Sequence, residues 1–263
     1  MLMRKVDAFR VQVRSVFRRT FHLLLGWLGI RRLREHSFFA TLLARPTVLA
    51  DLGAHRGEFF GTLKFEHPVW RAVLVEADPA LAESLKQTFA KDADVIHAAV
   101  VAKTGEGPVA FIRSMEPESS SIFMEWSAAH GIAEQVEVPA IEFSKVIRQL
   151  GGRVDLVKLD VEGAEIGVLQ SASASDLATC GQLMVEFHDK RPPFTRSDVD
   201  SVCRRLRSEG FGIVNANWPY VSDVFFVNLK SMPAVRRMEF RCRMGLANAL
   251  FIIRRAIFAS GYS

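Results

Sequence analysis

Cysteine is scarce in this chain of 263 residues, which contains Cys180, Cys203 and Cys242 and no others. The three lie far apart, and none of them has the C-x-x-C spacing typical of a structural zinc site. A disulfide framework is therefore not expected. We predict reduced thiols and a cytoplasmic location.

Long apolar runs are also lacking. The most apolar stretches, Phe21 to Ile30 and Met244 to Ile253, are about half as long as a helix needs to span a bilayer. No transmembrane helix is predicted. A signal peptide is not expected either, because the arginine-rich N-terminal region is too long and no small-residue cleavage site follows Ile30.

Charge is distributed unevenly along the chain. Residues 1–40 carry a net charge of +7 and residues 230–263 carry +6, which leaves −8 for residues 41–229 out of a total of +5. Basic arms on an acidic globule favour an anionic surface, either phospholipid or nucleic acid. The arms lack the interleaved aromatic and glycine residues of proteins that bind single-stranded nucleic acid, so nucleic acid is not expected as a partner.

The N-terminal arm has the pattern of a basic amphipathic helix. Arg10, Arg14 and Arg18 form one row at i, i+4 spacing, and a separate apolar row runs beside it. The apolar row consists of Val6, Phe9, Val13, Val16, Phe17, Leu24 and Leu28. Two interpretations stay open for both arms: helices packed on the domain with solvated basic faces, or peripheral contact with the inner face of a membrane.

The middle of the chain alternates short β-rich runs with helical patterns, which is typical of a parallel sheet with crossover helices. The length and the 49% of hydrophobic residues fit one α/β domain with appendages. We therefore divide the chain into a basic helical arm at 1–45, a domain at 46–230 and a basic helical arm at 231–263. Residues 105–140 are less periodic and are expected to form an insertion over the working edge of the sheet.

Seven strands and five helices are predicted in the domain. The strands are Thr47 to Leu52, Ala72 to Glu76, Val95 to Val100, Leu156 to Asp160, Leu183 to Phe187, Gly212 to Asn215 and Val224 to Asn228. The helices are Gly57 to Glu66, Pro79 to Ala90, Phe143 to Leu150, Ala164 to Gln170 and Ser197 to Glu209. The connection between the last two strands is short enough for an antiparallel hairpin.

The first strand leads into Asp51-Leu-Gly-Ala-His-Arg-Gly57, a junction between a strand and a helix. Glycine suits such a turn, because a ligand must approach the backbone closely. The nicotinamide fingerprint G-x-G-x-x-G does not fit, since Asp51 occupies its first glycine position and Gly57 comes one residue late. An acid there would repel a pyrophosphate and suits a ligand with a positive ammonium group.

The second strand ends at Glu76, followed by Ala77, Asp78 and Pro79. An acid at this strand tip can accept both ribose hydroxyls of a nucleoside. Asp78 is predicted to cap the next helix, with Pro79 in its first position. The sequence therefore predicts a nucleoside site between the first two strands.

Two later strands also end in polar residues. The run from Val154 to Leu169 breaks off into Lys158, Asp160 and Glu162, and a later strand ends in Glu186-Phe-His188. Ligands of open α/β sheets bind beyond the carboxyl ends of the strands, so we expect these side chains at the site. Helix capping is the structural alternative for Asp160.

Four segments resemble the motifs of the FkbM family of S-adenosylmethionine (SAM)-dependent methyltransferases. The most specific block is Lys158-Leu-Asp-Val-Glu-Gly-Ala-Glu165. The four segments are Val48 to Phe60, Val73 to Pro79, Val154 to Leu169 and Val185 to His188. The resemblance implies a class I fold: a Rossmann-like α/β sheet of seven mostly parallel strands whose last strand is antiparallel.

The resemblance also implies SAM as cofactor and O-methylation of a hydroxyl on a sugar, glycolipid or secondary metabolite. The loop would hold the amino acid end of SAM, and the second strand tip would hold its ribose. The cofactor-binding residues would be Asp51, Gly53, Ala54, His55, Gly57, Glu76 and Ala77. The family more often has asparagine at the position of His55. It also has an acid after the third strand, which is missing around residues 97–100.

Methylation of an alcohol needs a base for the hydroxyl proton, or a metal that lowers the hydroxyl's pKa. Asp160, Glu162, Glu186 and His188 are expected on the acceptor side, with His188 or Asp160 as the base. Lys158 would orient an acid or the substrate. A divalent metal is not expected, although Asp160 with Glu186 or His188 offers suitable ligands.

Two other functional classes stay open. A nicotinamide-dependent oxidoreductase shares the acid at the second strand but needs the missing phosphate-binding glycines. A membrane or RNA adaptor that keeps a nucleoside pocket without catalysis would fit the basic arms.

Overall fold

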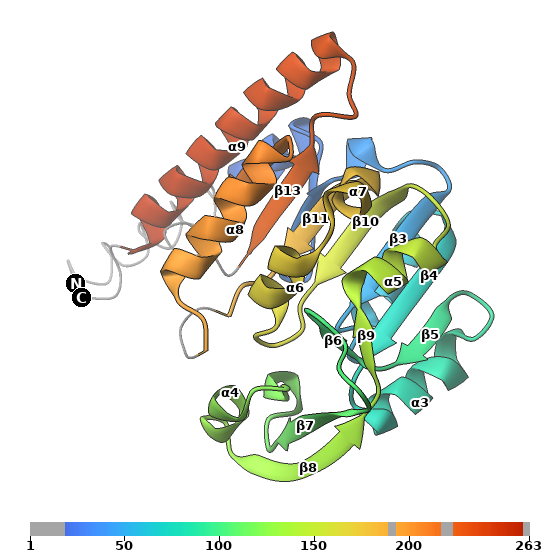
Figure 1. Ribbon diagram of the computed structural model, residues 1–263. Coiled ribbons are helices and arrows are strands. Elements are labelled where there is room, and N and C mark those ends of the chain that lie inside the picture. The colour runs from blue at the N-terminus through green and yellow to red at the C-terminus, as the bar shows by residue number, and fades with distance from the viewer. Residues whose placement is uncertain (1–18, 189–192, 217–222, 260–263) are drawn as a thin grey trace, which may run out of the picture.

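The centre of the computed structural model is a seven-stranded sheet in the order β12-β13-β11-β10-β3-β4-β5 (Figure 1). Residues 19–188, 193–216 and 223–259 are described by the structure. The strands are β3 (Thr47–Leu52), β4 (Val69–Glu76), β5 (Asp94–His97), β10 (Val154–Leu159), β11 (Cys180–Val185), β12 (Phe211–Asn215) and β13 (Val224–Asn228). β13 runs antiparallel to both of its neighbours, and the other neighbouring pairs are parallel. This confirms the predicted Rossmann-like α/β sheet with an antiparallel last strand.

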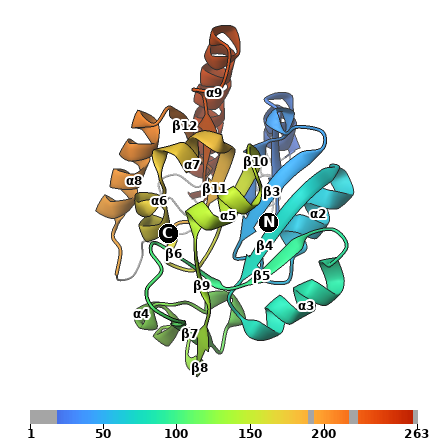
Figure 2. The same ribbon diagram turned by 45° about the vertical axis from the view of Figure 1, so that its right-hand side comes forward.

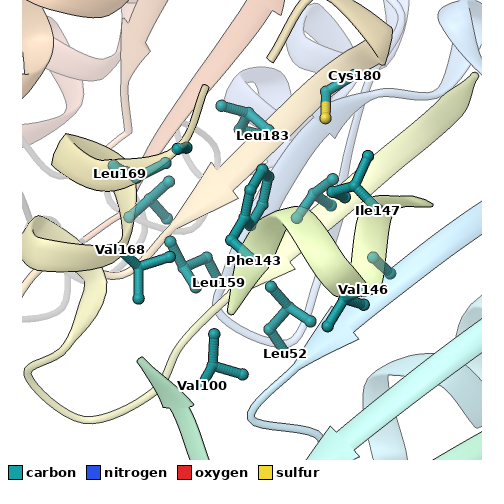
Figure 3. Packing of buried hydrophobic residues seen from close by; sticks show 14 of the residues in the cluster. Leu52, Val100, Phe143, Val146, Ile147, Leu159, Val168, Leu169, Cys180 and Leu183 are labelled. Carbon is teal, nitrogen blue, oxygen red and sulfur yellow. The ribbon is translucent and has the colours of Figure 1, made fainter. Parts of the chain in front are cut away.

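One face of the sheet is covered by four helices (Figure 1). They are α5 (Phe143–Gln149), α6 (Glu165–Ser171), α7 (Ala174–Thr179) and α8 (Arg196–Ser208). Their apolar side chains meet those of the central strands, as Figure 3 shows for Phe143 and Val168 against Leu52 and Leu159. The central strands β3 and β10 are buried at every position, as expected of parallel strands covered on both faces.

The opposite face is covered by α2 (Glu58–Glu66), α3 (Pro79–Phe89), the N-terminal segment and α9 (Ala234–Ala259). α2, α3, α5, α6 and α8 each begin and end within one residue of the predicted helices. Asp78 caps α3 as predicted, because its side chain accepts hydrogen bonds from the backbone of Ala80 and Leu81.

The described parts of the two arms, residues 19–45 and 231–259, pack on the domain, and the predicted helical arm at 1–45 is wrong for residues 30–42. Residues 19–27 are helical. They are followed by the hairpin β1 (Ile30–Leu33) and β2 (His36–Phe39) and by the 3₁₀ turn η1 (Ala40–Leu42). A hairpin forms because Phe38 and Phe39 bury their rings against the sheet, with Phe39 packing on Phe225. The predicted apolar positions from Val6 to Phe17 lie outside the described residues.

The C-terminal arm is helical as predicted. Phe240, Met244, Ala247 and Phe251 on α9 are buried against the sheet face, and Phe21 packs edge to face on Phe251. Figure 2 shows α9 rising beside the N-terminal segment. No helix within the described ranges has the length and apolar content needed to cross a bilayer.

The predicted strand from Val95 to Val100 is two strands. β5 ends at His97, and after Ala98 the chain enters β6 (Ala99–Val101), which pairs with β9 (Ala140–Glu142) outside the main sheet. The break allows the chain to leave the sheet toward the insertion. The insertion contains the hairpin of β7 (Val109–Ser114) and β8 (Ile132–Val138), with η2 (Pro117–Ser119) and α4 (Met124–Ala128) between them. It extends from the edge where β3, β4 and β10 end (Figure 1).

Candidate active site

A cavity of about 290 Å³ lies at the carboxyl ends of the parallel strands. Its walls come from the turns after β3, β4, β10 and β11, from the start of β6 and from the turn of the N-terminal hairpin. The insertion supplies Phe111, Glu118, Ser120 and Ile122. The cavity thus lies where open α/β sheets bind ligands, and the insertion forms its outer wall.

Gly53 begins the turn after β3 and lines the cavity. Its φ is +79°, and a Cβ at this position would lie 1.7 Å from the carbonyl oxygen of Asp160. Glycine is therefore required by the close approach of two backbone segments as well as by the left-handed conformation. The next two residues, Ala54 and His55, also line the cavity.

His55 adopts a φ of +49°, in the left-handed region that a few polar residues, asparagine above all, tolerate. This conformation explains physically why the FkbM family, which the sequence resembles, more often has asparagine at the position of His55. Gly57, at φ +72°, precedes α2, and a Cβ on it would collide with the ring of Phe89. Gly57 does not line the cavity, so its part in cofactor binding stays a prediction.

Lys158 connects three parts of the site. Its Nζ donates to the carbonyl oxygen of Gly53 at 2.7 Å and lies 3.2 Å from Asp160 Oδ2 and 3.6 Å from Asp51 Oδ1. Burial alone would lower the pKa of Lys158, but the two carboxylates raise it above its usual value. The ammonium group therefore stays charged and links the turn after β3 to the end of β10.

Asp51 is fully buried beneath the cavity and does not line it. Burial raises the pKa of its carboxyl group, and the Lys158 ammonium opposes that shift. Asp51 was predicted to contact the amino acid end of the cofactor. The structure instead pairs it with Lys158, so its effect on a bound ligand would be indirect.

Glu76 lies on the cavity wall at the end of β4, next to Ala77. Its two carboxylate oxygens accept the backbone N–H groups of His55 at 2.7 Å and of Asp78 at 2.8 Å. Burial raises the pKa of Glu76 in spite of these bonds. Each carboxylate oxygen has a second lone pair, so both oxygens can still accept hydrogen bonds from the hydroxyls of a ribose.

Three acids gather on the other side of the cavity. Asp160 follows β10, Glu162 adopts a strained φ of +54° two residues later, and Glu186 follows β11. Burial alone would raise the pKa of Asp160, but Lys158 and His36 hold it below its usual range. Burial and the neighbouring carboxylates raise the pKa values of Glu162 and Glu186 to about 8.

His188 is placed differently from the prediction. Its Nδ1 lies 3.0 Å from Glu165 Oε1 and its Nε2 lies 3.3 Å from Glu162 Oε2, and the ring contacts Trp126 edge to face. Burial would lower the pKa of His188, yet Glu165 and Glu162 raise it well above its usual value. His188 does not line the cavity. This geometry favours holding Glu162 in position over accepting a proton from a substrate.

His36 lines the cavity, although the sequence analysis did not predict it as a site residue. It belongs to the segment that was assigned to a helical arm, yet its Nε2 lies 3.6 Å from Asp160 Oδ2. Glu35 and Arg34, in the same hairpin turn, line the cavity as well. The segment before the turn, Ile30-Arg-Arg-Leu33, is half basic, so local pattern gave no clear signal of a hairpin.

Within the described part of the chain, two groups of side chains have ligand atoms close enough to hold a metal ion. They are His36 with Asp160 and Glu186, and Asp160 with Glu162 and His188, each with its ligand atoms within 4.8 Å of one another. The Lys158 ammonium already supplies a countercharge to Asp160 at 3.2 Å. The prediction that no metal is needed stays a prediction.

The chain was compared with known proteins. A sequence profile described as the Methyltransferase FkbM domain matches residues 51–213. A curated protein of Pseudomonas aeruginosa, the AMB antimetabolite synthetase AmbE, is 40% identical over 70 residues, which are 26% of this chain and 3% of that protein. The chain thus spans a small part of this relative's length.

Solved structures give a further comparison. A methyltransferase FkbM from Methylobacillus flagellatus is 15% identical with a TM-score of 0.45, covering 72% of this chain and 46% of that one. Magnesium protoporphyrin IX methyltransferase (ChlM) from Synechocystis, solved with bound SAM, is 13% identical with a TM-score of 0.38, covering 84% and 81%.

Proposed function

The chain belongs to the FkbM methyltransferase family, and we propose that this SAM-dependent methyltransferase acts on a hydroxyl of a sugar, glycolipid or secondary metabolite. The observation that carries the proposal is the division of one cavity into two chemically different sides. The turn after β3 and the tip of β4 form a side suited to a nucleoside, and Asp160, Glu162 and Glu186 form an acidic side at the tips of β10 and β11.

The nucleoside side fits SAM. Glu76 would accept both ribose hydroxyls through its remaining lone pairs. Gly53, Ala54 and His55 would lie beside the amino acid end of SAM. Asp51 lies beneath the cavity and would affect SAM indirectly, through its ion pair with Lys158. Ala99, Phe111 and Ile122 offer apolar surface for the adenine, in place of the acid that the chain lacks after its third strand.

The acidic side suits an uncharged or cationic acceptor that is rich in hydroxyls. Glu162 and Glu186 have pKa values of about 8. Their carboxyl groups would accept hydrogen bonds from neighbouring sugar hydroxyls and, when protonated, also donate to them. During transfer, the hydroxyl oxygen attacks the methyl carbon while the carbon–sulfur bond breaks with its electrons going to sulfur. S-adenosylhomocysteine leaves, and the hydroxyl proton passes to a base of the protein. Alignment of the three atoms supplies much of the rate.

The acceptor would be presented at an anionic membrane surface. Leu23, Leu24 and Trp27 on the N-terminal helix are exposed, although their neighbours Phe21 and Leu25 are buried in the domain. The basic charge of the two arms would add electrostatic attraction to this apolar contact. This supports a cytoplasmic enzyme that attaches peripherally to lipid.

The test is transfer of label from [methyl-³H]SAM into a total lipid and glycan extract, combined with calorimetric titration of SAM and of NADH. The proposal expects that SAM binds, that NADH does not bind, and that the label appears in a methyl ether formed from the acceptor hydroxyl. Binding of NADH with hydride transfer would favour an oxidoreductase. Binding of SAM without label transfer to any extract fraction would favour a non-catalytic adaptor and contradict the proposal.

A further inference from the structure

His36 is a buried imidazole on the wall of the cavity, and it comes from outside residues 51–213, which match the family profile. Its Nε2 lies 3.6 Å from Asp160 Oδ2, and its ring packs edge to face on Phe59. Asp160 is in turn held by Lys158 at 3.2 Å. The imidazole is thus paired with a carboxylate whose own position is fixed.

The hairpin that carries His36 is joined firmly to the sheet. The backbone N–H of Phe39 donates to Gln182 Oε1 at 2.8 Å, and Gln182 Nε2 donates to the carbonyl oxygen of Phe39 at 3.1 Å. Ser37 Oγ donates to Asp223 Oδ2 at 3.4 Å. These bonds attach β2 to β11 and to the start of β13, so His36 is positioned by the rigid part of the domain.

The other candidate bases are less suitable. His188 has both ring nitrogens occupied by Glu165 and Glu162 and does not line the cavity. Asp160 is a weak base, because Lys158 holds its pKa below the usual range. Glu186, with a pKa raised to about 8 by burial and by Asp160, retains its proton near neutral pH. His36, by contrast, lines the cavity, and its contact with Asp160 is made through Nε2.

We propose that His36 is the catalytic base that removes the proton of the acceptor hydroxyl, and that Asp160 positions it. The inference rests on the proposed O-methylation. An imidazole that pairs through Nε2–H with Asp160 keeps the lone pair of Nδ1 for the hydroxyl proton. As the oxygen–carbon bond forms and the carbon–sulfur bond breaks, the proton moves to Nδ1. The resulting imidazolium is stabilised by the Asp160 carboxylate until it releases the proton to solvent.

The first experiment measures label transfer from [methyl-³H]SAM into a total lipid and glycan extract. His36→Gln keeps the size and polarity of the side chain but cannot act as a base, so turnover should fall by roughly 10²- to 10⁴-fold while the affinity for SAM is unchanged. His36→Ala should regain part of its turnover when imidazole is added, which a purely structural role would not allow. The matched control is Arg31→Gln in the same hairpin, because Arg31 pairs with Glu66 on the surface and neither residue lines the cavity.

The outcomes separate this inference from the proposed function. Label transfer by the unmodified protein together with full activity of His36→Gln would overturn the role of His36 and leave O-methylation standing. Failure of imidazole to restore His36→Ala, in a variant that folds and binds SAM, would also count against the base. Absence of label transfer by the unmodified protein would overturn both.

A second experiment needs no acceptor. Nitrogen NMR spectra of the histidine side chains report which ring nitrogen carries the proton. Asp160→Asn should change the spectrum of His36, whereas Asp200→Asn on the exposed surface of α8 should not. A His36 spectrum that is the same in the unmodified protein and in Asp160→Asn would show that the pair does not exist and would overturn the proposal.

Discussion

Lys158 Nζ donates a 2.7 Å hydrogen bond to the carbonyl oxygen of Gly53. This bond joins the end of β10 to the turn after β3, its neighbour in the sheet. The same ammonium group compensates the buried carboxylates of Asp51 and Asp160. This cation stabilises the site, because removing it takes away the ion-pair partner of Asp51 and leaves Asp160 with His36.

We predict that Lys158→Met lowers the free energy of unfolding by about 3–5 kcal/mol, the usual cost of leaving a buried charge unpaired. Chemical denaturation would measure the loss. The double variant Lys158→Met with Asp51→Leu should recover part of it, since the buried carboxyl group that lost its ion-pair partner is then gone. An unchanged unfolding free energy in Lys158→Met would mean that the buried acids are neutral without the ammonium.

Glu76→Ala should weaken SAM binding by one to two orders of magnitude, roughly the value of a pair of charge-assisted hydrogen bonds. Calorimetric titration would give the affinity. Glu83→Gln on the exposed side of α3 serves as the control and should bind SAM normally. A folded Glu76→Ala variant with unchanged affinity would remove Glu76 from the cofactor site.

The tips of the strands could be predicted because each buried run ends abruptly in polar residues. Glu76 and Asp160 are located by that pattern alone, since the carboxyl ends of parallel strands meet at one edge. Asp51 was harder to place. It lies one residue before the end of β3, so it remains inside the fully buried strand below the cavity.

The contribution of the N-terminal hairpin could not be predicted. His36 reaches Asp160 through pairing of β2 with elements that follow it by more than 140 residues, for example through Gln182. His188 lies outside the cavity lining for a related reason. Its position after a strand is visible in the sequence, but its contact with Glu165, buried at the start of α6, comes from the tertiary structure. Both outcomes depend on tertiary contacts that local pattern does not contain.

Glu186 should make stability depend on pH. Burial, together with repulsion by Asp160, raises its folded-state pKa from 4.5 to about 8. Between these values the folded protein binds a proton that the unfolded chain has released, so this contribution to stability is fully present below pH about 4.5 and is lost as pH rises through about 8. Glu186→Gln should therefore reduce the fall of Tm with rising pH and melt above the unmodified protein at high pH.

Thermal melts across this range would test the effect of Glu186, with Glu137→Gln on exposed β8 as the control. Glu162 shifts in the same direction, so a part of the pH dependence should remain in the single variant. A Glu186→Gln variant whose Tm falls with pH as steeply as that of the unmodified protein would contradict the raised pKa.

Methyl transfer should not require a tightly bound metal ion. Lys158 already neutralises Asp160, the carboxylate shared by both groups of candidate ligands. We expect activity to survive dialysis against EDTA. Loss of activity on EDTA treatment, with recovery on adding magnesium or manganese, would instead assign the acidic side of the cavity to a cation.

The exposed apolar residues of the N-terminal helix should mediate attachment to anionic membranes. Leu23 is 74% exposed and Trp27 is 76% exposed, on a segment that belongs to an arm with a net charge of +7. Apolar burial and electrostatic attraction add at a membrane interface, and each basic residue near an anionic surface contributes about 1 kcal/mol. The full chain should therefore sediment with vesicles that contain phosphatidylglycerol and much less with phosphatidylcholine alone. Added salt should weaken the attachment in part.

The double variant Leu23→Ser with Trp27→Ser should remain largely in the supernatant of this vesicle assay. Both side chains are exposed, so the change should leave the fold intact. Phe65→Ser is the matched control: Phe65 is 92% exposed on α2, outside both arms, and its loss should not change sedimentation. Equal sedimentation of the double variant and the unmodified protein, or no sedimentation of either, would mean that the arms serve only to cover the sheet. In that case the acceptor would have to reach the cavity from solution.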